Sequence, residues 1–445
     1  MMNRDISPPP AKRRRVAPAA ISAFTDSESK GKITKEDMRL PSIRLFSWNI
    51  NGIGPLLPSQ TTRITSFFKP LNGDWDNSPA AGQPKLNGLR AFLSRHNWPE
   101  VLFLQELKIA EGDSKTLAAL LSALNTPSSA EGDKAPADTR TYTLDAALPR
   151  DRFNVRGFQG KLYGVGTILR TDFAREHVAR VRDVDWDREG RVSIVELKNK
   201  KKKKRRLTQS QQHEHDNDDT TDAEDYRRPL ALINVYAVNG TSAPYRSPRD
   251  GGRAVGTRHD HKRAFHSRLR DECLALEARG FHVVVAGDVN VARGRLDGYP
   301  NLRSFPREHC ANRADFNVKF FGPEDNARAQ AYCGVHDKEG GDGEKEEEKE
   351  EQKEKEKERC LDAVDVFRAM HGAERRYTYY PRSGEWGSSC DRVDMVFVSK
   401  GLWGAGQVLG TGILDTPQER GLSDHVPLWV EIAMAGSVNR ASEAS

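Results

Sequence analysis

The chain has 445 residues, of which 36% are hydrophobic and 30% are charged, and its formal net charge at pH 7 is +6. No run approaches the roughly 20 apolar residues of a membrane helix, and the N-terminus lacks the apolar core of a secretory signal, so we expect a soluble intracellular protein. The positive charge favours a polyanionic partner without identifying it.

The cysteines are scattered along the chain and include no CxxC pair. This spacing indicates neither a zinc site nor a disulfide framework, and it fits a reduced compartment. The five residues are Cys273, Cys310, Cys333, Cys360 and Cys390.

Residues 1–41 are rich in Pro, Ser, Lys and Asp and have no sustained apolar period, which predicts a disordered leader. Within it a basic cluster stands between prolines in PPPAKRRRVAP, the form of a nuclear import signal. The cluster consists of Lys12, Arg13, Arg14 and Arg15. A solvated tail with incidental charge is the alternative interpretation. We predict a nuclear protein.

The folded part is expected to begin with a strand, IRLFSWN, at residues 43–49. Its alternation places Ile43 and Leu45 on one face and Phe46 and Trp48 on the other. Further apolar segments with strand character lie at residues 101–104, 164–170, 191–198, 229–239, 281–288, 391–399 and 426–432.

Two helices are predicted between these strands. The first follows residue 104, where Asp113 or Ser114 can cap a stripe of leucines at helical spacing. The second ends at Gly280. Its apolar stripe consists of Phe265, Leu269, Cys273 and Leu276.

Two segments interrupt this pattern. Residues 199–228 run from a Lys/Arg block into His, Asp and Thr, and residues 336–359 are almost wholly Gly, Glu and Lys. Neither can bury enough apolar surface to offset the entropy of ordering, so both are expected to be loop insertions. We therefore predict a single domain over residues 42–433 that carries both insertions, followed by a disordered tail at residues 434–445.

Polar residues stand where the apolar strands end. Asn49, Glu106, Asn239 and Asp288 each follow or close such a strand, and Tyr236 lies just inside an end. A carboxylate at such a position is costly to desolvate unless a cation or hydrogen bonds compensate it. Several of them together predict one oxygen-rich pocket, and oxygen ligands are what Mg²⁺ prefers.

Each of these residues also has a structural interpretation when it is considered alone. Glu106 could cap the following helix, and residues 288–290 could form a turn. Asp394 could be an outward polar residue of an edge strand. Only their joint occurrence, with Asp424 and His425 before the last strand, favours a catalytic site.

Eight blocks carry a family resemblance: SWNINGI (47–53), LQELK (104–108), REGRVSIVEL (188–197), INVYAVNG (233–240), GDVNVA (287–292) with Asp297, YTYY (377–380), DRVD (391–394) and SDHVPL (423–428). In this order they resemble the exonuclease III family of apurinic/apyrimidinic endonucleases, within the endonuclease/exonuclease/phosphatase superfamily. GDVN and SDH mark only the superfamily, whereas NVYAVN and the Gly-Arg-Val block point to abasic-site endonucleases.

The resemblance implies an α/β fold, a DNase I-like four-layer sandwich of two mainly antiparallel sheets flanked by helices. It implies a Mg²⁺-dependent DNA phosphodiesterase, with Mn²⁺ as a substitute, that cleaves 5′ to abasic sites in DNA repair and leaves a 3′-hydroxyl. 3′-Exonuclease or 3′-phosphodiesterase activity is a further expectation. The expected partner is abasic duplex DNA. The protein is expected to act as a monomer and not to bind a membrane.

The resemblance also implies roles for individual residues. Glu106 would be the main metal ligand. The implied metal set also includes Asn49, Asn51, Asp288, Asn290, Asp424 and His425. Donors and a cation aimed at phosphate oxygens lower the barrier to phosphoryl transfer, which agrees with this assignment.

In the implied mechanism, Asp288 would orient or deprotonate the attacking water, with Asn290 beside it. His425, held in one tautomer by Asp394, would contact the scissile phosphate, and Tyr236 would steady the same group. The implied substrate-binding residues are Asn239, Arg191, Tyr379 and Arg392.

Two positions depart from the family pattern. Asp391 stands where the family often has a Trp that walls the abasic-sugar pocket, and Leu107 replaces a usual Thr. The Leu107 change is expected to be mild. Asp391 and the two insertions motivate the alternative function, an RNA nuclease or a phosphatase of small phosphate esters. A non-catalytic nuclear DNA-binding protein is a third, although it predicts a missing metal or base residue and none is missing. A Ser hydrolase would need a GxSxG elbow, which is absent from the sequence.

Overall fold

The computed structural model describes residues 42–57, 88–126, 140–155, 160–199, 228–323 and 360–434. The predicted leader with its basic cluster, nearly all of both predicted insertions and nearly all of the predicted tail lie outside these ranges. Among the helices of the described part, none is long and apolar enough to cross a membrane.

The first sheet has six strands in the order β15-β16-β1-β2-β4-β3. β1 and β2 are parallel, and the other neighbours in this sheet are antiparallel. The strands are β1 (Ser42–Asn49), β2 (Val101–Gln105), β3 (Tyr142–Ala147), β4 (Val165–Arg170), β15 (Val408–Ile413) and β16 (Leu428–Ala433).

The second sheet also has six strands, in the order β12-β14-β10-β7-β6-β5. Only β7 and β10 are parallel neighbours in it. The strands are β5 (Val178–Asp183), β6 (Val192–Leu197), β7 (Leu230–Tyr236), β10 (His282–Asp288), β12 (Ala363–Asp365) and β14 (Asp394–Ser399). Two short ribbons pair β8 (Pro244–Arg246) with β9 (Ala254–Thr257), and β11 (Gly298–Tyr299) with β13 (Cys390–Asp391).

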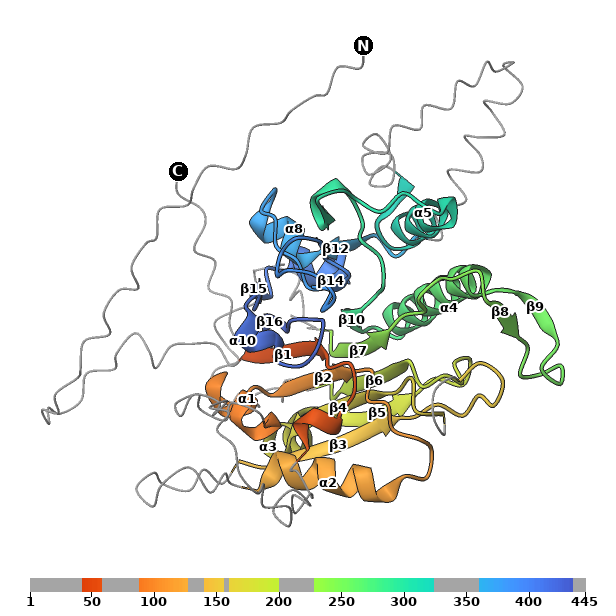
Figure 1. The fold of residues 1–445 in the computed structure, drawn as a ribbon. Coiled ribbons are helices and arrows are strands. Elements are labelled where there is room, and N and C mark those ends of the chain that lie inside the picture. The colour runs from red at the N-terminus through yellow and green to blue at the C-terminus, as the bar shows by residue number, and fades with distance from the viewer. Residues whose placement is uncertain are drawn as a thin grey trace, which may run out of the picture. The chain divides into compact units, whose positions relative to one another are not determined.

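Helices connect the strands of both sheets (Figure 1). The α-helices of the described part are α1 (Leu89–Arg95), α2 (Ser114–Asn125), α3 (Thr171–His177), α4 (Arg258–Ala278), α5 (Arg307–Phe321), α8 (Val366–His371), α9 (Lys400–Gly404) and α10 (Pro417–Arg420). Two 3₁₀ turns, η1 (Gly54–Leu56) and η5 (Arg295–Asp297), complete the set.

The two sheets pack face to face, and helices cover their outer faces. Leu45 and Phe103 of the first sheet share one buried cluster with Leu232 and Val284 of the second. On the outer face of the first sheet, residues of β1 and β2 bury against α1 and α2. On the outer face of the second, α4 and α5 pack on β7, β10 and β14. The predicted four-layer α/β sandwich is therefore confirmed.

Local sequence patterns predicted much of this fold. The alternation in β1 is confirmed, because Ile43 and Leu45 enter the cluster between the sheets while Phe46 and Trp48 face the helices. Asp113 caps α2 by accepting a hydrogen bond from the Thr116 amide at 3.1 Å, so Glu106 does not cap it. The predicted apolar stripe of α4 is buried.

The predicted strand at residues 391–399 begins only at Asp394, because Cys390 and Asp391 pair with β11 in a separate ribbon. β14 lies between β10 and β12, and Asp394 is only 2% exposed. The alternative that Asp394 is an outward residue of an edge strand is therefore wrong.

Polar side chains join the two sheets just below one edge of the sandwich. Gln105 of β2 donates from Nε2 to Ser47 Oγ at 3.0 Å and to Asn234 Oδ1 of β7 at 2.8 Å. The Asn234 amide in turn donates to the Gly166 carbonyl oxygen of β4 at 2.9 Å. Because buried polar groups are costly when unpaired, these bonds fix how the sheets align.

A buried ion network supports the start of β14. Arg392 is fully buried and donates from Nε to Asp297 Oδ1 at 2.8 Å and from Nη2 to Asp365 Oδ2 at 2.7 Å. Burial alone would raise the pKa of Asp365, but Arg392 and Arg293 outweigh it and hold that pKa well below its usual range. The Arg392 side chain is fully enclosed by this network, so in this structure its contacts are with the protein itself, and its predicted role in binding substrate stays a prediction.

We predict that Arg392→Met lowers the free energy of unfolding by about 3–5 kcal/mol, because it leaves two buried carboxylates without their shared cation. Urea unfolding followed by circular dichroism measures the change. Arg150→Met is the control, since Arg150 and Asp183 form an ion pair whose side chains are 46% and 51% exposed, and such pairs contribute less than about 1 kcal/mol. Equal losses in the two variants would contradict the role given to the buried network.

Candidate active site

The parallel strand pairs bring polar residues to one edge of the sandwich. Asn49 ends β1 and Glu106 follows β2, its parallel neighbour. In the other sheet Tyr236 ends β7 opposite Asp288 at the end of β10. Asp394 begins the antiparallel strand β14 and is also opposite Asp288. Residues from five strand ends therefore meet although they lie far apart in the chain.

A loop before β16 adds His425 to this edge. Ser423 donates from Oγ to the Asn49 carbonyl oxygen at 2.7 Å and accepts from the His425 amide at 3.0 Å. Trp48 donates from Nε1 to the His425 carbonyl oxygen at 3.1 Å. The loop is thus held against β1, and the imidazole has a fixed position.

Asn49 links the two sheets at the centre of the site. Its Nδ2 donates to Glu106 Oε1 at 3.2 Å and to Asp288 Oδ2 at 3.0 Å. Its Oδ1 accepts from the Asn51 amide at 3.0 Å. The side chain is fully buried, so its amide keeps the two carboxylates at a set separation.

Glu106 has three partners. Besides Asn49, it accepts from Tyr236 Oη at 2.7 Å and forms an ion pair with Lys108 Nζ at 2.9 Å. Burial alone would raise the pKa of Glu106, but Lys108 and the tyrosine hydrogen bond outweigh it and lower the pKa. The carboxylate is therefore ionised and able to bind a cation. Lys108 was not predicted as a site residue, although its place two residues after Glu106 was a usable signal.

Several non-glycine residues of the site have left-handed backbone conformations. The φ angles are 52° at Asn51, 54° at Glu106, 54° at Lys108 and 53° at Asn290. Such conformations are uncommon outside glycine and cost free energy that the surrounding structure must supply. Here they turn the chain sharply as each strand ends, which aims the side chains at the edge of the sandwich.

Asp288 is held by the residue two positions later. Asn290 donates to it from the backbone amide at 2.8 Å and from Nδ2 at 3.3 Å, and the same Nδ2 donates to the Ala237 carbonyl oxygen at 2.9 Å. Burial raises the pKa of Asp288, and the charge of Asp394 raises it further. A carboxyl group with a raised pKa can accept a proton near neutral pH.

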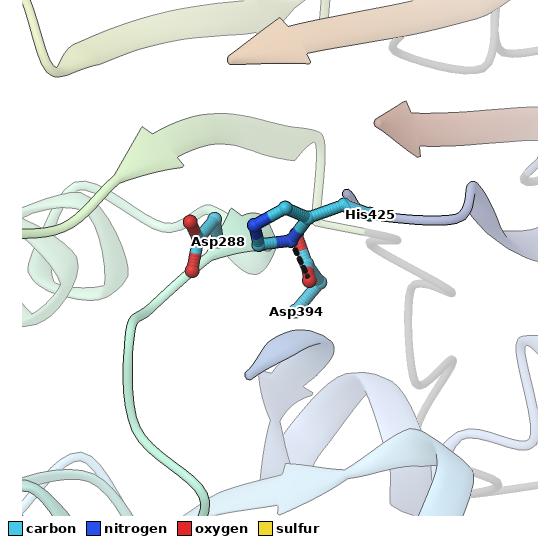
Figure 2. Close-up of side chains that lie close together, drawn as sticks. All are labelled: Asp288, Asp394 and His425. Atoms are coloured by element: carbon cyan, nitrogen blue, oxygen red, sulfur yellow. Dashed lines mark hydrogen bonds and ion pairs between the residues drawn. The ribbon is translucent and has the colours of Figure 1, made fainter. Parts of the chain in front are cut away.

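Asp394 and His425 form a buried pair, with Oδ2 and Nδ1 2.7 Å apart (Figure 2). The second ring nitrogen is on the side of Asp288 (Figure 2). Burial alone would lower the pKa of His425, but the charge and hydrogen bond of Asp394, with Asp288 and Asp424, raise it. The imidazole therefore favours its protonated form, a donor suited to an anionic ligand.

Asp424 completes the oxygen-rich edge beside His425. Its Oδ1 accepts from Asn51 Nδ2 at 3.0 Å, and Lys108 donates to Asn51 Oδ1. Asn51 therefore connects Asp424 to the lysine that pairs with Glu106. The predicted metal residues thus form one continuous polar network.

Six of the predicted catalytic and metal-binding residues line a pocket of about 250 Å³: Glu106, Tyr236, Asp288, Asn290, Asp424 and His425. Of the predicted substrate-binding residues, Asn239 and Tyr379 line it, and the Tyr379 ring lies 5.1 Å from the His425 ring. Asp391, which stands where the family often has Trp, lies in the wall beside them. The site prediction missed a basic and amide wall from α4, α5 and the loop before α5: Lys262, Arg303, His309, Asn312 and Arg313. The residues of this wall form no short sequence motif, because two helices and a loop contribute them.

Arg191 does not face this pocket. It is 1% exposed, donates from Nη1 to the Tyr236 carbonyl oxygen at 3.0 Å and from Nε to Glu189 at 2.6 Å, and its guanidinium lies 3.9 Å from the Tyr163 ring centroid. The predicted role of Arg191 in binding substrate stays a prediction, since its guanidinium contacts only protein groups in this structure. Its contacts instead hold the end of β7, where Tyr236 lies.

The residues present fit a hard divalent cation. Carboxylates and amide oxygens dominate the edge, and Asp394 Oδ1 is buried without a hydrogen-bond partner in the described structure. A carboxylate oxygen of Asp288 and one of Asp394 lie within 4.8 Å of each other. Mg²⁺ prefers such oxygen donors and needs only one or two carboxylates from the protein. The structure therefore offers two candidate binding sites for one cation: the first at Asp288 and Asp394, and the second at the ionised Glu106 with Asn51 and Asp424 close by.

Comparisons with known proteins assign the chain to a family and agree with its fold. The model of the endonuclease/exonuclease/phosphatase family matches residues 46–425. No curated protein sequence matches the chain.

Among solved structures, the chain is similar to the AP endonuclease LMAP from Leishmania major, with a TM-score of 0.50, 18% identity and coverage of 91% of each chain. It is also similar to the catalytic domain of Xenopus laevis APE2, with a TM-score of 0.48, 17% identity and coverage of 88% of this chain and 94% of that one. A third similar structure is a 3′-5′ exonuclease from Neisseria meningitidis, with a TM-score of 0.46, 16% identity and coverage of 88% and 100%.

We predict that Asp394→Asn lowers the pKa of His425 strongly in the metal-free protein, because the charge that offsets burial is removed while the burial remains. Asp424→Asn is the matched control and should lower that pKa less, since Asp424 contributes less than Asp394. NMR titration of the imidazole signals measures both. A His425 pKa unchanged by Asp394→Asn would show that the pair does not control its protonation.

Proposed function

Because the chain belongs to the endonuclease/exonuclease/phosphatase family of hydrolases, we propose that it is a magnesium-dependent DNA phosphodiesterase and that it cleaves 5′ to abasic sites. The observation that carries this proposal is the meeting of Glu106, Asp288 and His425 in one pocket. The sequence blocks that resemble abasic-site endonucleases supply the choice of substrate. 3′-Exonuclease or 3′-phosphodiesterase activity belongs to the same proposal, as does action by a monomer.

In this proposal the cation is Mg²⁺, with Mn²⁺ as a substitute, and it supplies positive charge to a phosphate oxygen. Glu106 is its main ligand, assisted by Asn49 or Asn51 and by Asp424. The lowered pKa of Glu106 supports this role, since a metal ligand must be deprotonated. Metal binding would compete with the Lys108 ammonium for the same carboxylate.

The chain's own residues perform the remaining steps. Asp288, whose raised pKa suits a base, orients the attacking water and accepts its proton, and Asn290 holds the carboxylate in place. His425 donates a hydrogen bond to the phosphate from its second ring nitrogen while Asp394 holds the first. Tyr236, whose phenol pKa is raised by burial, stays protonated and steadies the same phosphate as a hydrogen-bond donor. Donors fixed in advance stabilise the charge that grows on the phosphate.

The chemistry of the pocket wall also affects which substrate the pocket favours. Val393, Tyr379 and Asp391 lie in the lining, so apolar surface remains where the family often has a Trp. Burial raises the pKa of Asp391 to about 6. A carboxyl group in this wall favours a sugar or base that presents a polar group, which is why RNA and small phosphate esters remain the substrates to test against.

The domain division stays part of the proposal. A catalytic domain over residues 42–433, with insertions at residues 199–228 and 336–359, is supported by the family match to residues 46–425. The segments at residues 1–41 and 434–445 would flank it.

We predict that the protein nicks an abasic duplex with Mg²⁺ and that a chelator stops the reaction. Glu106→Gln should abolish the metal-dependent nicking, because the charge is lost while the shape is kept. Asp288→Asn should lower kcat about 10²- to 10⁴-fold through loss of the base. A gel assay of nicked product measures both.

Glu374→Gln, in which a 48% exposed carboxylate is changed, should nick like the original protein. Full activity of Glu106→Gln would remove that residue from the metal site. Faster cleavage of RNA or of intact duplex than of abasic duplex would reject the proposed substrate.

We also propose a nuclear location, carried by the basic cluster at residues 12–15. A fusion of the full chain to a fluorescent protein should collect in the nucleus of a eukaryotic cell, and the variant with all four basic residues changed to Ala should not. Import carriers recognise such clusters by charge. Equal nuclear signal from both fusions would assign import to another part of the chain.

A further inference from the structure

Phe305 is the most exposed large apolar side chain of the described residues. It is 81% exposed, whereas the next such residue, Leu422, is 58% exposed. Single exposed apolar residues are common on protein surfaces and need no explanation by themselves. The position of Phe305 and the way its backbone is held make it different.

Hydrogen bonds fix the chain on both sides of Phe305. Arg313, which is buried, donates from Nε to the Ala292 carbonyl oxygen at 2.7 Å and from Nη2 to the Arg303 carbonyl oxygen. Cys310 donates from Sγ to the Ser304 carbonyl oxygen at 3.4 Å. The next residue, Pro306, is the N-cap of α5, and its carbonyl oxygen accepts from the His309 amide at 3.0 Å. The aromatic ring is therefore presented to solvent by an ordered segment.

This segment borders the catalytic pocket. Arg303 and His309, on either side of Phe305 in the chain, both line the pocket that contains Asp288 and His425. The side chains of Arg303 and Arg307 are exposed next to the phenylalanine. An exposed aromatic side chain thus lies in the chain between two pocket-lining residues, Arg303 and His309, with an exposed arginine two positions away on each side.

We infer that Phe305 stacks on a base of the DNA strand that enters the pocket, next to the cleaved phosphodiester. This inference rests on the proposed function. Arginines neutralise the phosphates of such a strand, and a flat apolar ring gains from covering the face of a base whatever its identity. The ring would hold the strand in register without contributing to the chemical step.

The test compares two duplexes that share the same central abasic site and differ in the nucleotides around it. In the first, ordinary nucleotides flank the cleaved bond; in the second, the three nucleotides on each side in that strand are base-free tetrahydrofuran units. Affinity is measured by fluorescence anisotropy with a chelator present, so that no cleavage occurs. Phe305→Ala should weaken binding of the first duplex about 5- to 150-fold, the range that one base stack contributes, and should leave binding of the second unchanged.

Phe305→Trp should bind the first duplex like the original protein, because its ring also stacks. Leu409→Ala is the control. Leu409 is 44% exposed in β15 and lies beside the C-terminal end of β16, whereas His425 precedes the N-terminal end of that strand. Its replacement should change the affinity for neither duplex. With Mg²⁺ present, Phe305→Ala should raise KM for the first duplex and leave kcat at saturation unchanged. The melting temperature of every variant is compared to exclude a change in folding.

Equal affinity of Phe305→Ala and the original protein for the first duplex would overturn the inference. Equal weakening on both duplexes would also overturn it, since the ring would then act on the backbone rather than on a base. Failure of the original protein to nick either duplex would count against the proposed function, while the affinities would still decide the role of Phe305.

Discussion

The site depends on the buried amide of Asn49. It donates one hydrogen bond to Glu106 at the edge of one sheet and another to Asp288 at the edge of the other. Two carboxylates in a low-dielectric environment repel each other, so their approach needs a donor between them or a cation beside them. The polar layer below, where Gln105 bonds to Asn234, aligns the sheets so that one amide reaches both. The geometry of the site is therefore a consequence of how the two sheets register.

The titratable side chains of the site differ in the direction of their pKa shifts. Glu106, with its lowered pKa, stays ionised and suits a cation. Asp288 and His425 have raised pKa values, which suit a base and a phosphate donor respectively. Burial acts on all three, and the difference arises from the neighbours: Lys108 lies beside Glu106, and the charge of Asp394 acts on both Asp288 and His425. Opposite roles for similar side chains come from environment rather than from residue type.

Part of the remaining polar structure supports the site without lining its pocket. Arg191 holds the end of β7 and Arg392 supports the start of β14, and both are enclosed by carboxylates or carbonyl oxygens. Arg392 stands in the same short block as Asp394, and Arg191 stands in a block of the same resemblance, so a motif by itself does not separate buried supports from residues that line the pocket. Exposure to the pocket separates them, because Tyr379 and Asn239 line the pocket and the two arginines do not.

The sequence by itself determined the local features: the faces of β1, the cap of α2, the buried stripe of α4 and the polar residues at strand ends. These follow from periodicity and side-chain chemistry, which act over a few residues. It also predicted, through resemblance, which side chains would gather. Only the tertiary structure decided which residues of a motif face the pocket, that Lys262 and Arg313 form its basic wall, and that Phe305 stays exposed at its rim. Those outcomes depend on contacts between segments far apart in the chain, and the burial of a side chain is a property of the packed molecule rather than of its neighbours in sequence.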